Sequence, residues 1–171
     1  MLYLLSMFTA VPQIANQAST VAPTIPQNQT EVPQLQYTLH VEDSEDDIGP
    51  FSSPQFAGSG KKRLEGFTIS VVSGQVDLEY TAHLEGQHDD TAAVKMGSFI
   101  GTRGESRRLE GFTINLKGES AELYNIHYLC TVEGQINSPA LKNGEFCGTR
   151  DQSLNLYGFL VYITKKYLKT Q

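Results

Sequence analysis

The feature that most constrains this chain is a sequence pattern that occurs three times. Its best-kept copy is the segment F-I-G-T-R-G-E-S-R-R-L-E-G-F-T-I-N-L, which runs from Phe99 to Leu116. Shorter versions begin at Phe56 and at Phe146. A tyrosine precedes each copy by 19, 19 and 18 residues, at Tyr37, Tyr80 and Tyr128. Repeats spaced by 43 and 48 residues bury their hydrophobic faces against one another. We therefore expect one domain of three like units.

The repeats read as short β-strands. Apolar and polar residues alternate strictly along one stretch of the second copy, and the apolar positions are Leu78, Tyr80, Ala82 and Leu84. A period of two predicts a strand with one buried face. Phe112, Ile114 and Leu116 form the same pattern later in the copy, and no window of helical length carries a helical stripe. The pattern predicts an all-β fold.

Three such units can close in two ways. One is a prism of three sheets around a common axis, and the alternative is a β-trefoil, a barrel capped by three hairpins. Both shorten or remove exposed strand edges. We favour the β-prism-like arrangement, with the domain spanning residues 35–171 and repeats at about 35–75, 76–120 and 121–166.

Residues 1–34 differ in composition from the rest. Residues 1–11 are apolar, and a segment rich in Gln, Asn, Thr, Ala and Pro follows. The apolar run is too short to span a bilayer, so we expect no transmembrane span. Two interpretations stay open: a secretion signal, or an extended arm that docks on a partner or on a second copy of the chain.

The net charge of −6 argues against nucleic acid as a partner, because phosphate backbones are bound by basic surfaces. The sequence shows no phosphate-binding glycine loop and no nucleophile–base pairing, so we expect a protein that is not an enzyme.

The three copies resemble the ChW repeat, the clostridial hydrophobic repeat with a conserved tryptophan. The second copy carries the resemblance at Tyr80, His83, Gly86, Gly97, Gly101-Thr102, Gly104, Leu109-Glu110 and Ile114. The first copy keeps Tyr37, His40, Gly58 and Leu64-Glu65, and the third keeps Gly134, Gly144, Gly148-Thr149 and Leu156 but has Thr131 in place of the histidine. All three copies lack the tryptophan, and Gln87 and Gln135 stand at its place.

The resemblance implies a non-catalytic, secreted or cell-surface module for binding or adhesion, with a surface glycan or a protein as partner. Rigid strands that carry variable loops favour recognition by loops 42–55, 86–97 and 134–143. The candidate ligand-binding residues are Asp43, Glu45, Asp46, Asp47, Gln87, His88, Asp89, Asp90, Gln135 and Asn137. The alternative is a structural subunit of an extracellular assembly that docks through residues 1–34.

Several polar residues recur at matching positions. His40 and His83 belong to different repeats, so we expect them to lie apart in hydrogen-bonding roles and not to share a metal site. Glu65 and Glu110 are expected to form strand-edge ion pairs with Arg63, Arg108 or Arg103. The acidic loop 42–47 offers carboxylates that calcium accepts, but it lacks the EF-hand spacing, and we expect no cofactor.

Cys130 and Cys147 lie within one repeat, where the second copy has the apolar residues Ala82 and Ile100. In an oxidising compartment they are a candidate disulfide, and in a reducing one they would be two small core residues.

Overall fold

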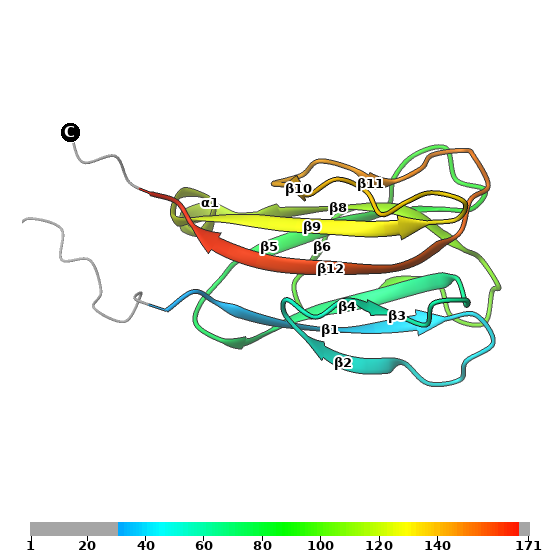
Figure 1. Cartoon of the computed structure of the whole chain (residues 1–171), viewed down its shortest axis with the longest axis horizontal. Coiled ribbons are helices and arrows are strands. Elements are labelled where there is room, and N and C mark those ends of the chain that lie inside the picture. Colours follow the sequence, from blue (N-terminus) through cyan, green and yellow to red (C-terminus); the bar gives the residue numbers. More distant parts are fainter. Residues whose placement is uncertain (1–30, 168–171) are drawn as a thin grey trace, which may run out of the picture.

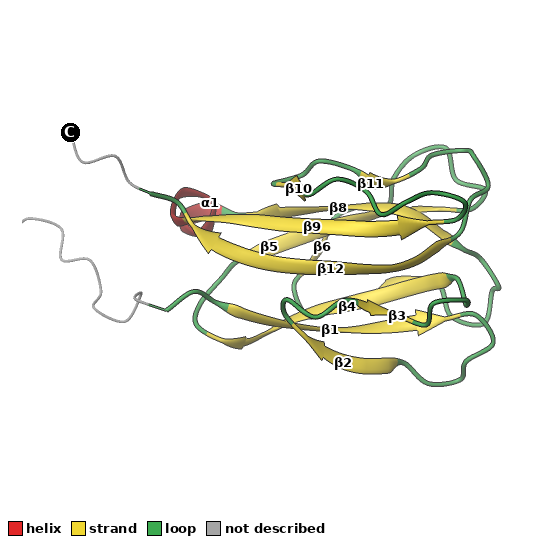
Figure 2. Cartoon of the chain, viewed as in Figure 1, coloured by secondary structure: helices red, strands yellow, loops and turns green. Residues whose placement is uncertain are grey.

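The computed structural model describes residues 31–167 and is almost entirely β-structure (Figures 1 and 2). The first repeat forms β1 (Gln34–Val41), β2 (Ile48–Ser52), β3 (Ala57–Gly58) and β4 (Leu64–Ser73). The second forms β5 (Leu78–Leu84), β6 (Val94–Lys95), β7 (Ile100–Gly101) and β8 (Leu109–Leu116). The third forms β9 (Tyr124–Val132), β10 (Leu141–Lys142), β11 (Cys147–Gly148) and β12 (Leu156–Lys165), and the short helix α1 (Gly118–Leu123) precedes it.

The strands form three antiparallel sheets of four strands each, with the orders β2-β1-β4-β7, β11-β8-β5-β6 and β10-β9-β12-β3. We call them the first, second and third sheets, after the repeat that supplies their long strands. Each repeat gives three strands to its own sheet and one short strand to a neighbouring sheet. These exchanged strands are β3, β7 and β11, and they link the three sheets in a closed ring.

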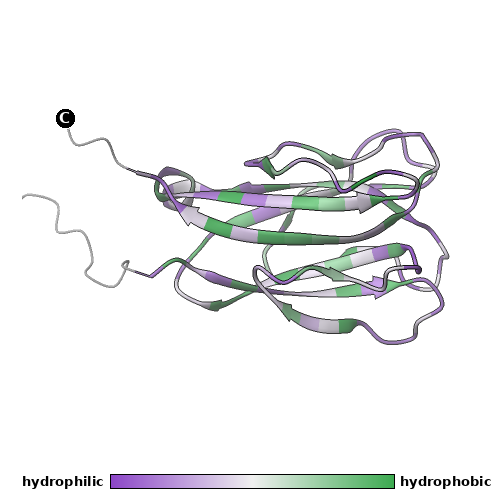
Figure 3. Ribbon diagram, viewed as in Figure 1, coloured by the Kyte–Doolittle hydropathy of each residue, from purple (hydrophilic) through white to green (hydrophobic). Residues whose placement is uncertain are grey.

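The core lies between the three sheets. Phe67, Phe112 and Phe159, one from each repeat, are fully buried, and their ring centroids lie 5.1–5.4 Å apart. Figure 3 shows hydrophobic and hydrophilic residues alternating along the long strands, as a sheet with one face in the core requires. The three phenylalanines therefore mark the pseudo-threefold axis.

The recurring tyrosines fix the exchanged strands. The buried hydroxyls of Tyr37, Tyr80 and Tyr128 donate to the carbonyl oxygens of Gln55, Ser98 and Glu145. Each acceptor directly precedes the phenylalanine at which the chain crosses to the neighbouring sheet. The spacing of 18 or 19 residues between tyrosine and phenylalanine is thus the length of chain that connects a long strand to the exchanged strand of the same repeat.

The predicted fold class is confirmed: the structure is all-β with pseudo-threefold symmetry, and it adopts the prism-like arrangement and not the trefoil, because the strands form three separate sheets. The predicted inward residues of β5 and β8 are buried. The expected hydrogen-bonding roles of the two histidines are confirmed, since His40 pairs with Asp47 and His83 pairs with Asp90. Both histidines are buried, and His83 is only 1% exposed, because the neighbouring repeat covers them.

The proposed signal or arm falls largely on residues 1–30, outside the described part of the chain. Among residues 31–167, no helix is long and apolar enough to cross a membrane. Helix α1 accounts for part of the longer spacing between the second and third repeats, since the turn between β4 and β5 has no counterpart to it.

Candidate functional site

Polar side chains join the repeats at the end of the molecule where β1, β5 and β9 finish, on the right in Figure 1. At the junction of the second and third repeats, His83 Nδ1 lies 3.1 Å from Asp90 Oδ1. Arg150 donates to both oxygens of Asp90, at 3.1 and 2.6 Å. Its guanidinium carbon lies 3.4 Å above the centre of the Phe146 ring. The charge of Arg150 is therefore shared between a carboxylate and an aromatic face.

The junction of the first and second repeats has the same construction. His40 Nδ1 lies 3.2 Å from Asp47 Oδ1, and Arg103 binds both Asp47 oxygens. The Arg103 guanidinium lies 3.9 Å above the ring of Phe99. The pKa of each aspartate is lowered, and the largest cause is the hydrogen bonds from the arginine. The charge of the arginine contributes less, and partial burial opposes the shift. We call these two sites the capped junctions.

Glycines in the long strands make room for the phenylalanines of these junctions. A Cβ atom on Gly66 would collide with the Phe99 ring, and one on Gly111 would collide with the Phe146 ring. The rings therefore lie directly on the strand backbone and cover the histidines beside them. This close approach explains the glycine that precedes each of the three core phenylalanines, and it buries the outer face of the strand at this point.

The third junction lacks the cap. Phe56 lies on Gly158 in the equivalent place, but Gly60 stands where the arginine would be, and the ring is 40% exposed. Thr131 replaces the histidine, and its hydroxyl donates to Asn137 Oδ1 at 2.6 Å, where the other junctions have an aspartate. We call this site the open junction.

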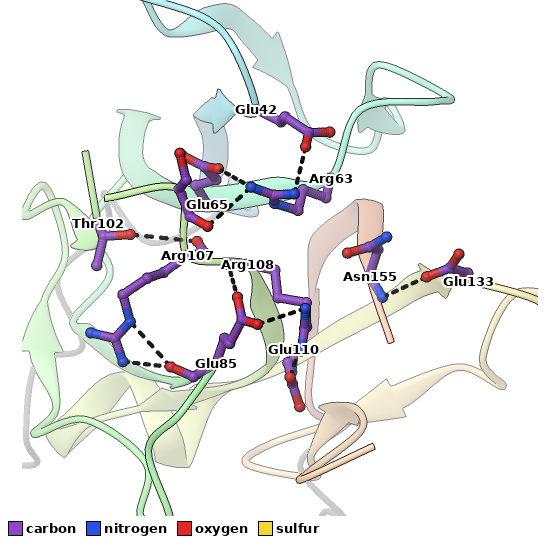
Figure 4. A network of polar contacts seen from close by, with 11 residues as sticks. Glu42, Arg63, Glu65, Glu85, Thr102, Arg107, Arg108, Glu110, Glu133 and Asn155 are labelled. Atoms are coloured by element: carbon purple, nitrogen blue, oxygen red, sulfur yellow. Dashed lines mark hydrogen bonds and ion pairs between the residues drawn. The ribbon is translucent and has the colours of Figure 1, made fainter. Parts of the chain in front are cut away.

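At the same end of the molecule, a network of polar contacts recurs at matching positions of the three repeats (Figure 4). We call these three positions the ring of ion pairs. Arg63 binds Glu42 and, at 3.0 Å, Glu65. The equivalent Arg108 binds Glu85 at 2.8 Å and Glu110 at 2.9 Å. The predicted pairing of Glu65 and Glu110 with Arg63 and Arg108 is therefore present, but both glutamates are buried and not at an exposed edge. Arg103, the third candidate, binds Asp47 instead.

The third repeat departs from this ring as well. Asn155 stands at the place of the two arginines, where its backbone N–H donates to Glu133 at 3.2 Å. Tyr157 stands at the place of the two buried glutamates. The third position of the ring therefore lacks the arginine and its buried carboxylate partner.

The candidate ligand residues all lie in the loops at this end, but they do not form one site. The carboxylates of Asp47 and Asp90 bind arginine in the capped junctions. The remaining residues are exposed except for the half-buried Gln87: Asp43, Glu45, Asp46, His88, Asp89, Gln135 and Asn137. Within residues 31–167, no group of three or more His, Cys, Asp or Glu side chains is placed to hold a metal ion.

The outer face of the third sheet differs from the outer faces of the other two. Leu129 and Leu160 lie opposite each other on it, where the first and second sheets have threonine pairs. Next to them the rings of His127 and Tyr162 stack at 5.0 Å, where the other sheets have Gln36 with Ser70 and Glu79 with Asn115. Burial, and then the charge of Lys142, lower the pKa of His127. The centre of this face is therefore apolar and aromatic, and Lys142 lies opposite His127 at its edge.

A shallow groove extends this face toward the chain termini. Its lining includes Val32, Asn125, His127, Tyr162, Thr164 and Tyr167, and Tyr167 is almost fully exposed. With Phe56 at the other end, we call the surface formed by Phe56, Leu129, Leu160, His127 and Tyr162 the open face. The loop-based expectation missed it, although a position-by-position comparison of the three copies shows the unusual leucines and the missing arginine.

Cys130 and Cys147 form a disulfide, as the oxidised alternative predicted. Cys130 belongs to β9 of the third sheet, whereas Cys147 belongs to β11, which pairs with β8 of the second sheet. The bond therefore ties two sheets together through the core, where both cysteines are fully buried.

A search of curated proteins found no match to this chain, and a search of solved structures found none either. A family model does match: residues 90–118 fit the family described as Clostridial hydrophobic W, or ChW. The matched segment begins at the capping Asp90 and ends just after β8, so it contains Phe99, Arg103 and the Glu110-Gly111-Phe112 sequence. Within the second repeat, residues 90–118 thus match the ChW family, and the first and third repeats share the structure of the second.

Proposed function

We propose that this chain is a non-catalytic extracellular binding module that recognises carbohydrate on a surface. The observation that carries the proposal is the open face. Three sheets of one construction surround the core, yet only the third has an outer face with stacked aromatic rings and paired leucines. Because the first and second sheets hold the same fold with Thr, Gln, Ser, Glu and Asn at these positions, the fold does not require the apolar residues.

The chemistry of this face suits a sugar polymer. Exposed aromatic rings bind the apolar faces of sugar rings, and flanking side-chain amides and hydroxyls bind their hydroxyl groups. Phe56 and Tyr162 both lie on the outer side of β12, Phe56 over Gly158 and Tyr162 four residues further along. Four residues of a strand span about 13 Å, so the two rings are spaced for a short stretch of polymer and not for a single small molecule.

Two further observations support an extracellular, non-catalytic role. A disulfide persists in oxidising compartments, which agrees with secretion or display on a cell surface. The residues best suited to acid–base chemistry, His40, His83, Glu65 and Glu110, are buried in the junctions and in the ring of ion pairs. They hold the repeats together, so their recurrence has a structural explanation.

The test is retention of the purified full-length chain by polysaccharides. Affinity electrophoresis through gels containing neutral polysaccharides, with anionic ones in parallel, should show slowed migration with at least one neutral polymer. Tyr162→Ala should restore free migration. Ser70→Ala alters the equivalent position of the first sheet and should behave as the unmodified protein does. If no polysaccharide retards the protein, or if both variants act alike, the proposal is refuted.

We propose as the second candidate a structural subunit that uses residues 1–34 as a docking arm. One observation favours it, because Val32, close to the start of the described chain, lines the groove at the end of the open face. In that case the open face would receive an arm, and the full-length chain would form a defined oligomer. Light scattering on the eluting protein distinguishes the two: a monomer supports the binding module, and a concentration-independent oligomer supports the assembly.

A further inference from the structure

The open junction differs from the capped junctions at three positions, and two of the differences together remove an ion pair. Arginine becomes Gly60, aspartate becomes Asn137, and histidine becomes Thr131. The phenylalanine is retained as Phe56. In the capped junctions a guanidinium lies over the equivalent ring, and at the open junction no arginine covers Phe56.

The position of these groups follows from the strand register. Thr131 lies opposite Gly158 in the β9–β12 pair, and the Phe56 ring lies on Gly158. The hydroxyl of Thr131 holds Asn137 through the amide oxygen, which leaves the Asn137 Nδ2 group directed away from that bond as a donor. An exposed aromatic face therefore lies beside a hydroxyl and a side-chain amide, and the open face continues from it along β12.

We propose that the open junction is a subsite for the ring of a neutral sugar, with the bare face of Phe56 as its platform and Asn137 and Thr131 as its hydrogen-bonding groups. This inference rests on the proposed carbohydrate-binding function and assigns its position. The sugar ring would take the place that the guanidinium of Arg103 or Arg150 occupies in the capped junctions.

Two kinds of ligand could lie on the Phe56 ring: a sugar ring, or an arginine side chain from a partner protein. The absence of an aspartate at the open junction favours the sugar. In both capped junctions the guanidinium makes two hydrogen bonds to an aspartate. At the open junction an incoming arginine would find an amide, and it would lose the ion pair that offsets the removal of its charge from water. An amide can both donate to and accept from hydroxyl groups, so it suits an uncharged polyhydroxyl ring.

The experiment measures the affinity of the full-length chain for the neutral polysaccharides that retard it, by isothermal titration calorimetry. Phe56→Leu keeps apolar cover on Gly158 but removes the aromatic platform, and Phe56→Tyr keeps the platform. We expect Phe56→Leu to weaken binding about tenfold, which is the scale of one aromatic contact, and Phe56→Tyr to retain the affinity. Asn137→Ala should also weaken it. Val72→Ala, an exposed position on β4 of the first sheet, is the matched control.

Each result has a distinct meaning. Weaker binding by Phe56→Leu and Asn137→Ala, with an unchanged thermal midpoint for unfolding, supports the subsite. Unchanged binding by both variants while Tyr162→Ala still abolishes binding overturns the subsite and leaves the proposed function intact. No binding by the unmodified chain overturns both. Competition by N-acetylarginine amide, with affinity that falls as salt increases, would overturn the sugar in favour of an arginine-bearing partner.

Discussion

The disulfide offers the sharpest test of how the sheets are held together. Cys130 and Cys147 are 17 residues apart in the chain, and the bond connects the third sheet to the second. Closing a loop of this length lowers the entropy of the unfolded chain, and the chain-entropy relation gives a stabilisation of about 3 kcal/mol. The molecule itself supplies the replacement: the equivalent pair is Leu39 with Ala57 in the first repeat and Ala82 with Ile100 in the second.

We therefore expect the double variant Cys130→Ala with Cys147→Ile to fold, because its side chains copy the buried pair of the second repeat. Its free energy of unfolding in urea should be about 3 kcal/mol lower than that of the oxidised protein. The reduced wild-type chain is the control and should resemble the variant. Intact mass, lower by two hydrogen atoms in the oxidised protein, verifies the bond. A variant within about 1 kcal/mol of the oxidised protein would refute the reasoning, since the closed loop would then contribute little.

Three further predictions concern the junctions and the buried tyrosines. Arginine lowers the pKa values of Asp47 and Asp90, so the two carboxylates stabilise the fold above the pKa of an unfolded aspartate, and this stabilisation is lost as pH falls through the lower folded values. Urea midpoints measured between pH 6 and pH 2 should therefore decline less in the double variant Asp47→Asn with Asp90→Asn than in the wild type. Gly111→Ala should lower the free energy of unfolding by about 2–3 kcal/mol, because the new methyl group collides with Phe146 and the β11 backbone. Gly86→Ala should lower it by about 1 kcal/mol through backbone strain alone, because Gly86 has φ +74 and no atom lies within 4 Å of the added Cβ; calorimetric unfolding of both variants tests the difference. Burial raises the pKa of Tyr37 to about 12, so stability should fall as pH rises from about 10, and Tyr37→Phe should remove much of that dependence while lowering stability at pH 7 by about 1–2 kcal/mol through the unpaired Gln55 carbonyl.

The sequence predicts the architecture well because the architecture is local and repeated. Alternation in β5 and β8 identifies the strands, and the recurrence of Tyr80 and Phe99 identifies the repeat. The junctions were beyond the same reasoning, because they depend on a strand of one repeat entering the sheet of another. Nothing within residues 76–120 indicates that Arg103 binds Asp47, 56 residues earlier in the chain, or that Phe99 covers Gly66.

The candidate site shows a second limit of sequence patterns. Acidic loops are typical candidates for ligand sites, yet Asp47 and Asp90 form ion pairs with arginines. The open face is identified instead when the three copies are compared position by position. Leu129 and Leu160 fit the alternation of a strand only as outward apolar residues, which occur on many protein surfaces. They become informative once the register places them opposite each other, with Phe56 and Tyr162 on either side of Leu160 along β12.

The departures of the third repeat are coupled physically, and this coupling argues for the open face as a surface with its own role. Four charged positions of the other repeats and junctions have uncharged residues at this junction, namely Gly60 from the first repeat and Asn137, Asn155 and Tyr157 from the third. Loss of a single partner, such as the arginine alone, would leave a partly buried aspartate without its counter-ion, which is costly. Loss of the arginine and the aspartate together leaves neither of them unpaired at the open junction, and it also leaves the Phe56 ring bare. A protein of net charge −6 thus presents one surface of aromatic and apolar side chains, which suits an uncharged ligand.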